Sequence, residues 1–237
     1  MNSVVLKDVS LCSIVRDEIM NPAGGIERFV ESHVPYVEEA VIVDTGSVDG
    51  TREKLEELKN RYSNLKVFDV PFHGYANARN KSLEFVKTKK ALILDADELL
   101  THEKPQNDWE RLKYILENYS SEVYSFRFFG IAPDRPNFEE IDTQVLRVFT
   151  NRKDHQFKSV MGEYLEHSRL VTDIGDRILI KHFVPSAIAE GKKKKNWYGT
   201  KGIYSDKERL SLWKKSPSEI DGFCEWKKFN PKRNDYI

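Results

Sequence analysis

The sequence is poor in cysteine, in long hydrophobic runs and in net charge. Its 237 residues include two cysteines, Cys12 and Cys224, which lie too far apart along the chain to suggest a disulfide framework. No stretch approaches the roughly 18 consecutive apolar residues of a membrane span, and no secretory signal is recognisable at the N-terminus. These absences predict a soluble protein in a reducing, cytoplasmic environment.

The balance of charges argues against a nucleic-acid-binding protein. Lysine and arginine number 38, as do aspartate and glutamate, so the formal net charge is zero. The charges are unevenly distributed, however, because the chain from Gly191 onward carries 13 basic and 6 acidic residues, a net of +7, which leaves −7 before it. The sequence thus predicts an acidic body followed by a basic tail that contains the lysine run 192–195.

The chain has enough apolar material for one packed domain, with 39% hydrophobic residues including 13 Phe, 10 Tyr and 4 Trp. Strand and helix patterns alternate up to residue 119, which predicts a mostly parallel sheet with helices on both faces. The expected strands are 10–15, 40–43, 65–70 and 91–94, and the expected helices are 27–37, a helix ending at 61, 75–87 and 105–119. Later runs at 123–129, 144–149, 163–165 and 177–180 predict mixed or antiparallel strands, and the tail from residue 187 is expected to be helical.

Unusual polar residues follow three of the expected strands. Arg16 and Glu18 follow the first strand, Asp44 follows the second, and an Asp-Ala-Asp-Glu run at 95–98 follows the fourth. Ligands of open α/β sheets bind beyond the carboxyl ends of the strands. The D-x-D spacing places the two aspartates on the same side of an extended segment, where they need a divalent cation or a basic group between them. Mg²⁺ or Mn²⁺ at such a site predicts a nucleotide diphosphate ligand.

Four motifs occur in order between residues 13 and 98. They are Ser-Ile-Val-Arg-Asp-Glu at 13–18, Val-Asp-Thr-Gly-Ser-Val-Asp-Gly-Thr at 43–51, Ala-Arg-Asn at 78–80 and Asp-Ala-Asp-Glu at 95–98. Together they resemble the nucleotide-sugar-binding half of a glycosyltransferase family 2 enzyme with the GT-A fold. The resemblance implies a single GT-A-type catalytic domain over 1–237. Its parts are a nucleotide-sugar-binding half at 1–119, an acceptor half at 120–186 and a basic tail at 187–237.

The resemblance also implies roles for the donor-side residues. Asp44 would accept a hydrogen bond from the nucleotide base, with Arg16 and Glu18 along the same base and ribose pocket. Arg79 would face the base or the diphosphate. Asp17 stands where the family often has Asn, which adds negative charge near the nucleotide.

The remaining implied roles concern the metal and the reaction. Asp95 would contact ribose, and Asp97 would ligate a Mn²⁺ or Mg²⁺ ion that bridges the phosphates. The segment from Leu-Arg-Val-Phe at 146–149 to Gly-Glu at 162–163 resembles lipopolysaccharide-core-type members that end in His-Glu. Those enzymes invert, which makes Glu163 the expected base, with Glu166 as its alternative. His182 would be a further metal ligand.

Several alternatives stay open at this stage. A nucleotidyltransferase shares the layered sheet, although the Ala-Gly-Gly sequence at 23–25 lacks the cations of a phosphate loop. A non-catalytic subunit that binds sugar nucleotides is another possibility. The expected donor is a nucleotide-diphosphate sugar, a UDP-sugar in particular, and the acceptor is a carbohydrate, lipid-linked or peptide group. The basic tail suits a solvated helix, a lid over the diphosphate, or contact with an anionic membrane surface.

Overall fold

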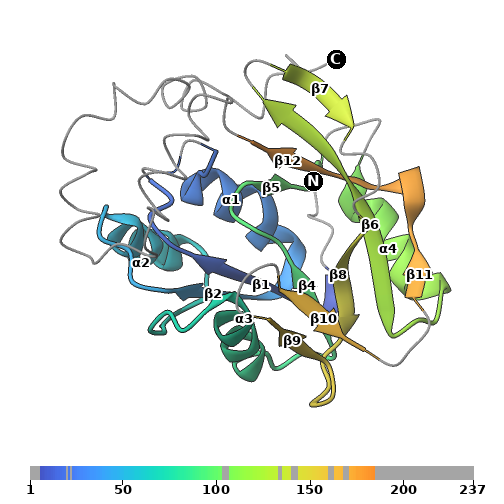
Figure 1. The fold of residues 1–237 in the computed structure, drawn as a ribbon, viewed down its shortest axis with the longest axis horizontal. Helices are drawn as coiled ribbons and strands as arrows, with labels where there is room; N and C mark the ends of the chain where they lie inside the picture. Colours follow the sequence, from blue (N-terminus) through green and yellow to red (C-terminus); the bar gives the residue numbers. More distant parts are fainter. Residues whose placement is uncertain are drawn as a thin grey trace.

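Four parallel strands form the first half of the sheet, as predicted (Figure 1). The computed structural model describes residues 6–19, 21, 23–102, 107–132, 135–139, 144–159, 163–167 and 171–184. The strands lie in the order β3-β2-β1-β4, which places β1 at the centre of this half. Their bounds are β1 (Leu6–Val15), β2 (Val37–Asp44), β3 (Leu65–Asp69) and β4 (Lys90–Ile93).

The second half of the sheet is mixed, also as predicted. It continues from β4 in the order β8-β6-β12-β5, with β8 antiparallel to β4 and β6, while β12 runs parallel to β6 and antiparallel to β5. β7 and β11 pair with β6 off this path. The bounds are β5 (Glu98–Leu99), β6 (Val123–Ala132), β7 (Arg135–Glu139), β8 (Val145–Thr150), β11 (Val171–Asp173) and β12 (Leu179–Phe183). The sequence patterns missed β5, β7 and β11, and of these β5 and β11 are too short, at two and three residues, to show a clear period.

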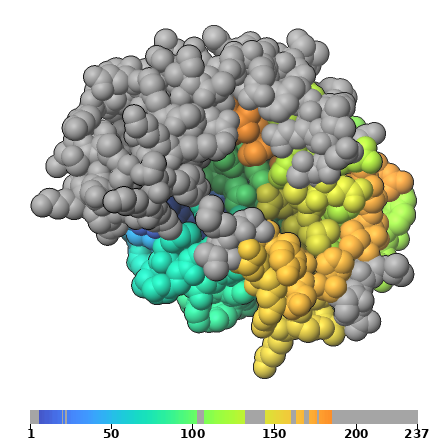
Figure 2. Space-filling model, in the orientation of Figure 1, coloured from blue at the N-terminus to red at the C-terminus, as the bar shows by residue number. Residues whose placement is uncertain are grey.

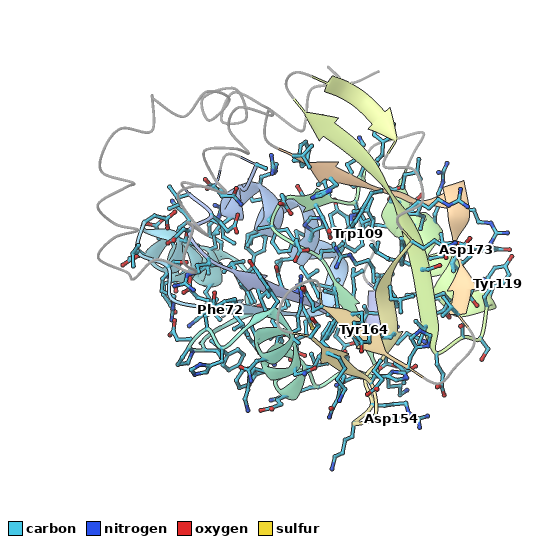
Figure 3. All side chains as sticks on the ribbon, viewed as in Figure 1. Phe72, Trp109, Tyr119, Asp154, Tyr164 and Asp173 are labelled. Atoms are coloured by element: carbon cyan, nitrogen blue, oxygen red, sulfur yellow. The ribbon has the colours of Figure 1, made fainter. Side chains whose placement is uncertain are left out.

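Helices cover both faces of the sheet. They are α1 (Ile26–His33), α2 (Thr51–Arg61), α3 (Tyr75–Glu84) and α4 (Asp108–Asn118). Successive strand residues face opposite sides, and Leu11 accordingly packs in one core cluster with α1, α2 and α4, whereas Cys12 packs in another with α3. The unbroken apolar runs of the parallel strands therefore reflect burial on both faces. The buried Trp109 of α4 is labelled in Figure 3.

The first helix ends earlier than the predicted residue 37. α1 ends at His33, and a 3₁₀ turn over Val34–Tyr36 follows it. Pro35 explains the difference, because it has no backbone N–H to continue the α-helical hydrogen bonding. The predicted helix of the basic tail lies outside the described residues, and the single domain over 1–237 stays a prediction. Within the described ranges, no helix combines the length and the apolar character needed to cross a membrane.

His33 joins α1 to the chain that follows β5. Its Nδ1 lies 2.7 Å from the carbonyl oxygen of Phe29, and the backbone N–H of Leu100 donates to Nε2 at 3.2 Å. Because Nε2 accepts from a backbone N–H, the proton of the neutral ring belongs on Nδ1. The ring is fully buried, and this burial lowers the pKa of His33 to about 3.

The buried His33 should make the fold sensitive to mild acid. In the unfolded chain the group titrates near pH 6.5, so its contribution to stability is complete above that pH and is lost as the pH falls toward 3. Each pH unit below 6.5 should cost about 1.4 kcal/mol. In urea titrations from pH 6 to 5, His33→Gln should remove about this slope from the parent's pH dependence.

Comparing the variant with the parent separates the effect of His33 from that of groups whose protonation stabilises the fold as the pH falls. Burial raises the pKa of Asp108 to about 6 and that of Glu98 to about 7, but both groups are present in the variant too. Equal pH slopes for His33→Gln and the parent would contradict the assignment.

Candidate active site

The carboxyl ends of β1, β2 and β4 meet at one edge of the sheet, where the predicted site residues begin. Asp44 ends β2 beside Val15 of β1. Its Oδ1 accepts hydrogen bonds from the backbone N–H groups of Gly46 and Ser47, both at 2.8 Å. Its Oδ2 is buried and has no hydrogen-bond partner among the described residues. A buried acceptor left unpaired is costly, so Asp44 is suited to accept an N–H group from a ligand.

Asp17 holds in place the loop that follows Asp44, through contacts with Ser47 and Val48. Its Oδ1 accepts from the backbone N–H of Val48 at 2.7 Å, and its own N–H donates to Oγ of Ser47 at 2.9 Å. Asp17 is fully buried and has a φ of 56°, a left-handed conformation in which Asp and Asn are both enriched. This conformation explains why either residue fits the position. The structure thus places the Asp17 carboxylate in a loop-to-loop contact, which the sequence did not predict.

Arg16 and Glu18 flank Asp17 and differ in their surroundings. The guanidinium of Arg16 lies 5.4 Å from the ring centroid of Phe72, which Figure 3 labels near α3. Glu18 is buried, and its Oε2 accepts from Nδ2 of Asn21 at 2.9 Å. A side chain at Gly24 would collide with the same oxygen. Arg16 therefore lies beside an aromatic ring, whereas Glu18 is enclosed by its own loop, and nucleotide contact by either residue stays a prediction.

The Asp-Ala-Asp-Glu run forms a turn, so the expectation of an extended segment is wrong. The backbone N–H of Glu98 donates to the carbonyl of Asp95 at 2.9 Å. The N–H of Asp95 donates in return to Oε2 of Glu98 at 3.0 Å. Because the chain reverses here, the two aspartates have different partners: Asp95 contacts arginines, and Oδ2 of Asp97 lies 4.0 Å from Nε2 of His182.

Two arginines, the buried Arg79 and the partly buried Arg147, bind the carboxylates of this turn. Arg79 of α3 is 3% exposed and donates through Nη2 to Asp95. Arg147 of β8 donates through one Nη2 to Asp95 at 3.2 Å and also to Glu98. The Arg147 guanidinium also lies 5.3 Å from the ring centroid of Phe128. The arginines thus neutralise acidic groups that would otherwise repel one another in a poorly solvated site.

The titration of the two carboxylates differs accordingly. Burial raises the pKa of Asp95, but Arg79 and Arg147 lower it by more, so its pKa falls well below the usual range. Burial dominates at Glu98, whose pKa rises to about 7 in spite of Arg147. At neutral pH, Asp95 is therefore ionised, whereas burial disfavours the charged form of Glu98.

Glu163 joins this cluster through Arg79. Nε of Arg79 donates to Oε1 of Glu163 at 3.3 Å, so one guanidinium contacts both Glu163 and Asp95. The alternative base, Glu166, is exposed and forms an ion pair with Lys158 at 3.3 Å. The geometry therefore favours Glu163 over Glu166 as the carboxylate of the site. Gly162, which stands in place of the family's His, lies outside the described residues.

The cluster fits a divalent cation in charge and in ligand chemistry. The carboxylates of Asp95, Glu98 and Glu163 contact two arginines, and Asp97 lies beside His182, so four carboxylates and two arginines give a net charge of −2 when all four carboxylates are ionised. Asp97 and His182 are partly exposed and offer oxygen and nitrogen donors at one point. The described residues hold no group of three or more metal-ligating side chains. Mg²⁺ commonly uses only one or two carboxylates together with substrate phosphates.

The structure brings together five of the predicted residues around Arg79 and the turn. They are Arg79, Asp95, Asp97, Glu163 and His182. Arg16, Glu18 and Asp44 lie at the ends of the adjacent strands. The sequence reasoning assigned no role to Arg147 or to the side chain of Glu98. The available signal was an arginine in the mostly apolar strand pattern Leu-Arg-Val-Phe, since a buried arginine requires acidic partners.

A mixed sheet whose parallel half ends in clustered carboxylates is the architecture of glycosyltransferases with the GT-A fold. The model of the family "Glycosyl transferase family 2" matches residues 19–167, and the chain belongs to this family. No curated protein sequence matches the chain. The predicted family and fold are therefore confirmed, the fold by the solved structures that follow.

Similar solved structures include two of TarS from S. aureus and one of a mannosyltransferase. A TarS structure aligns with a TM-score of 0.54 at 13% identity over 74% of this chain and 36% of that chain. TarS 1–349 in complex with UDP gives 0.56, at 14% identity over 74% and 60%. Mannosyltransferase PcManGT from Pyrobaculum calidifontis, in complex with GDP-Man and Mn²⁺, gives 0.54 at 17% identity over 76% and 58%. The chain thus spans 36–60% of the length of these proteins, and such identities show the fold alone.

Removing Arg147 should destabilise the fold strongly. Arg147→Met leaves Glu98 buried without its partner, and breaking a buried ion pair in this way costs about 3–5 kcal/mol. The double variant Glu98→Gln/Arg147→Met should recover part of the loss, because it also removes the stranded charge. Urea unfolding measures both effects.

Arg152→Met is the matched control, since Arg152 makes ion pairs at the exposed end of β8. It should change the unfolding midpoint little. An equal loss in the Arg147 and Arg152 variants would contradict the importance of the buried pair.

Proposed function

We propose that the protein transfers a sugar from a nucleotide-diphosphate sugar to an acceptor hydroxyl, with inversion and with Mn²⁺ or Mg²⁺. The observation that carries this proposal is the acidic cluster around Arg79. It places the candidate base Glu163, the candidate ribose contact Asp95 and the candidate metal ligand Asp97 at one edge of a family 2 fold. Its excess negative charge suits a cation that accompanies a diphosphate.

The donor side of the site is built to recognise a base. The unpaired Oδ2 of Asp44 suits an N–H group on the Watson–Crick edge of uracil or guanine. Arg16, which lies against Phe72, would border the same pocket. The complexes of TarS with UDP and UDP-GlcNAc and of PcManGT with GDP-Man support a nucleotide-sugar donor. We propose a UDP-sugar for this chain, with Glu18 close to the ribose.

Asp97 and His182 are the residues that would hold the cation. When bound, the ion would neutralise the charge that develops on the departing diphosphate. Arg79 and Arg147 fix the carboxylate of Asp95, which leaves it ionised and oriented to accept hydrogen bonds from ribose hydroxyls.

Glu163 would act as the general base of a direct displacement. The acceptor oxygen forms a bond to the anomeric carbon while the bond from that carbon to the diphosphate oxygen breaks, which inverts the configuration. The hydroxyl proton passes to the carboxylate of Glu163. Arg79 orients this carboxylate through its contact at Oε1.

The acceptor is a hydroxyl group of a carbohydrate, a lipid-linked sugar or a peptide. The low cysteine content supports a cytoplasmic location. The basic tail, 187–237, would approach either the diphosphate or an anionic membrane surface. No role for nucleic acid is proposed, because the body of the protein is acidic.

Asp97→Asn should abolish metal-dependent donor binding. A panel of nucleotide sugars, each with and without Mn²⁺, identifies the donor by thermal shift. A ligand at 100 times its Kd stabilises the parent by about 2.7 kcal/mol. For a chain of this size, each kcal/mol raises the melting temperature by about 2–4 °C. Asp97→Asn should lose the Mn²⁺-dependent part of this shift, whereas Asp154→Asn, a change at an exposed aspartate, should keep it. A full Mn²⁺-dependent shift in Asp97→Asn would refute the metal assignment.

Glu163→Gln should separate turnover from binding. Loss of a general base lowers kcat about 10²–10⁴-fold, while the donor Kd measured by calorimetry should stay within about threefold of the parent. Glu166→Gln is the matched control and should keep its turnover, because Glu166 is exposed and paired with Lys158. Slow hydrolysis of the donor provides the assay before an acceptor is known. If Glu163→Gln hydrolyses the donor at the parent rate, the proposed base is wrong.

A further inference from the structure

The segment that carries Glu163 is not part of the main sheet. β9 (Gln156–Lys158) and β10 (Tyr164–Glu166) form a separate two-stranded antiparallel sheet, and Glu163 directly precedes β10. A two-stranded hairpin is marginally stable on its own, so its position depends on what it packs against. Figure 2 shows this hairpin beside α3 at the surface, and Figure 3 labels its Tyr164. The placement of the proposed base therefore depends on α3.

Apolar side chains pack the hairpin against α3. Phe157 of β9 and Leu165 of β10 are paired across the hairpin and are both buried. They belong to the same core cluster as Ala76 and Leu83 of α3. Such contacts are not directional, so they bring the two elements together without specifying the position of Glu163 to within a fraction of an ångström.

Asn80 of α3 adds two directional contacts to this packing. Its Nδ2 donates to the carbonyl oxygen of Phe157 at 2.9 Å, and the N–H of Phe157 donates to its Oδ1 at 2.8 Å. A side-chain amide has the same donor and acceptor as a peptide group. Asn80 thus pairs with Phe157 as a residue of a neighbouring strand would, and it fixes β9 along and across the helix.

The preceding residue of α3 reaches Glu163 itself. Nε of Arg79 contacts Oε1 of Glu163, and Nη2 of the same guanidinium contacts Asp95. Arg79 is buried within these ion pairs, a placement that favours a role in orienting the two carboxylates. Asn80 therefore attaches α3 to the backbone of the hairpin, and Arg79 attaches α3 to the proposed general base, Glu163.

We propose that Asn80 is a positioning residue, which holds the hairpin so that Glu163 meets Arg79 and the donor-side carboxylates. This inference rests on the proposed role of Glu163 as the base. Removing Arg79 would leave Asp95 and Glu163 without their buried cation and endanger folding. Asn80 is neutral and half-buried, so it offers the cleaner test.

The test compares Asn80→Ala with Asn64→Ala. Asn64 also makes two hydrogen bonds to backbone groups, from its Nδ2 to the carbonyls of Val34 and Val37, both at 2.9 Å. It does so beside the amino end of β2, away from the hairpin. Both variants should lose a similar amount of stability in urea. Each variant loses two side-chain hydrogen bonds to backbone groups. Any difference between the variants in catalysis or in hairpin mobility therefore reflects where these hydrogen bonds lie and not how many are lost.

Asn80→Ala should lower kcat for donor turnover about 10–100-fold, because small misplacements of a reacting group have effects of this size. The donor KM should stay within about threefold, and amide hydrogen exchange should accelerate at 156–158 and 164–166. Asn64→Ala should keep the parent kcat and the parent exchange rates in the hairpin. The proposal is overturned if the hairpin of Asn80→Ala exchanges at the parent rate. It is also overturned if the two variants lose kcat equally.

Glu163→Gln distinguishes failure of this inference from failure of the proposed function. If Glu163→Gln keeps full turnover, Glu163 is not the base, and the claim that Asn80 positions a base fails with it. If Glu163→Gln is inactive while Asn80→Ala turns over at the parent rate, the proposed function stands and the role of Asn80 is wrong.

Discussion

Two guanidinium groups, one buried and one partly buried, hold the acidic edge of this sheet together. Arg79 comes from α3 and Arg147 from β8, yet both contact Asp95 in the turn after β4. Without them, carboxylates from separate elements would meet in a poorly solvated site and either repel one another or take up protons. With them, Asp95 stays ionised, and the remaining negative charge is close to what a divalent cation would balance. Folding and ligand chemistry therefore depend on the same ion pairs.

The parallel half of the fold was predictable because its signals are local. β1, β2 and β4 contain apolar runs that are buried on both faces, and polar loops separate the strands from the helices. The hydrophobic period alone identifies such elements. β5 and β9 are only two and three residues long. Contacts with distant parts of the chain stabilise them, so no local sequence pattern predicts them. Pro35, by contrast, is a local signal for the early end of α1.

The site was predictable in its residue types more than in its geometry. The carboxylates at 95, 97 and 163 were expected from strand ends and family motifs. In the structure, Asp95 and Glu163 both contact Arg79, while Asp97 lies beside His182. The turn at 95–98 was not expected, because its four-residue sequence is compatible with both an extended segment and a turn. The hydrogen bond from the backbone N–H of Asp95 to Glu98 distinguishes the two conformations. The contact of Arg147 with the turn joins residues about fifty positions apart and could not be derived from either segment by itself.

The separate hairpin also has an evolutionary consequence. The residues proposed to bind the nucleotide lie at the ends of strands whose neighbours constrain them on both sides, whereas Glu163 directly precedes a strand of a small two-stranded sheet that packs on α3 and on Phe149 of β8. Substitutions in β9 and β10 can therefore shift or reshape the acceptor side and leave the sheet intact. Such a division would let related enzymes diversify the molecules they modify while they inherit one way of holding the donor.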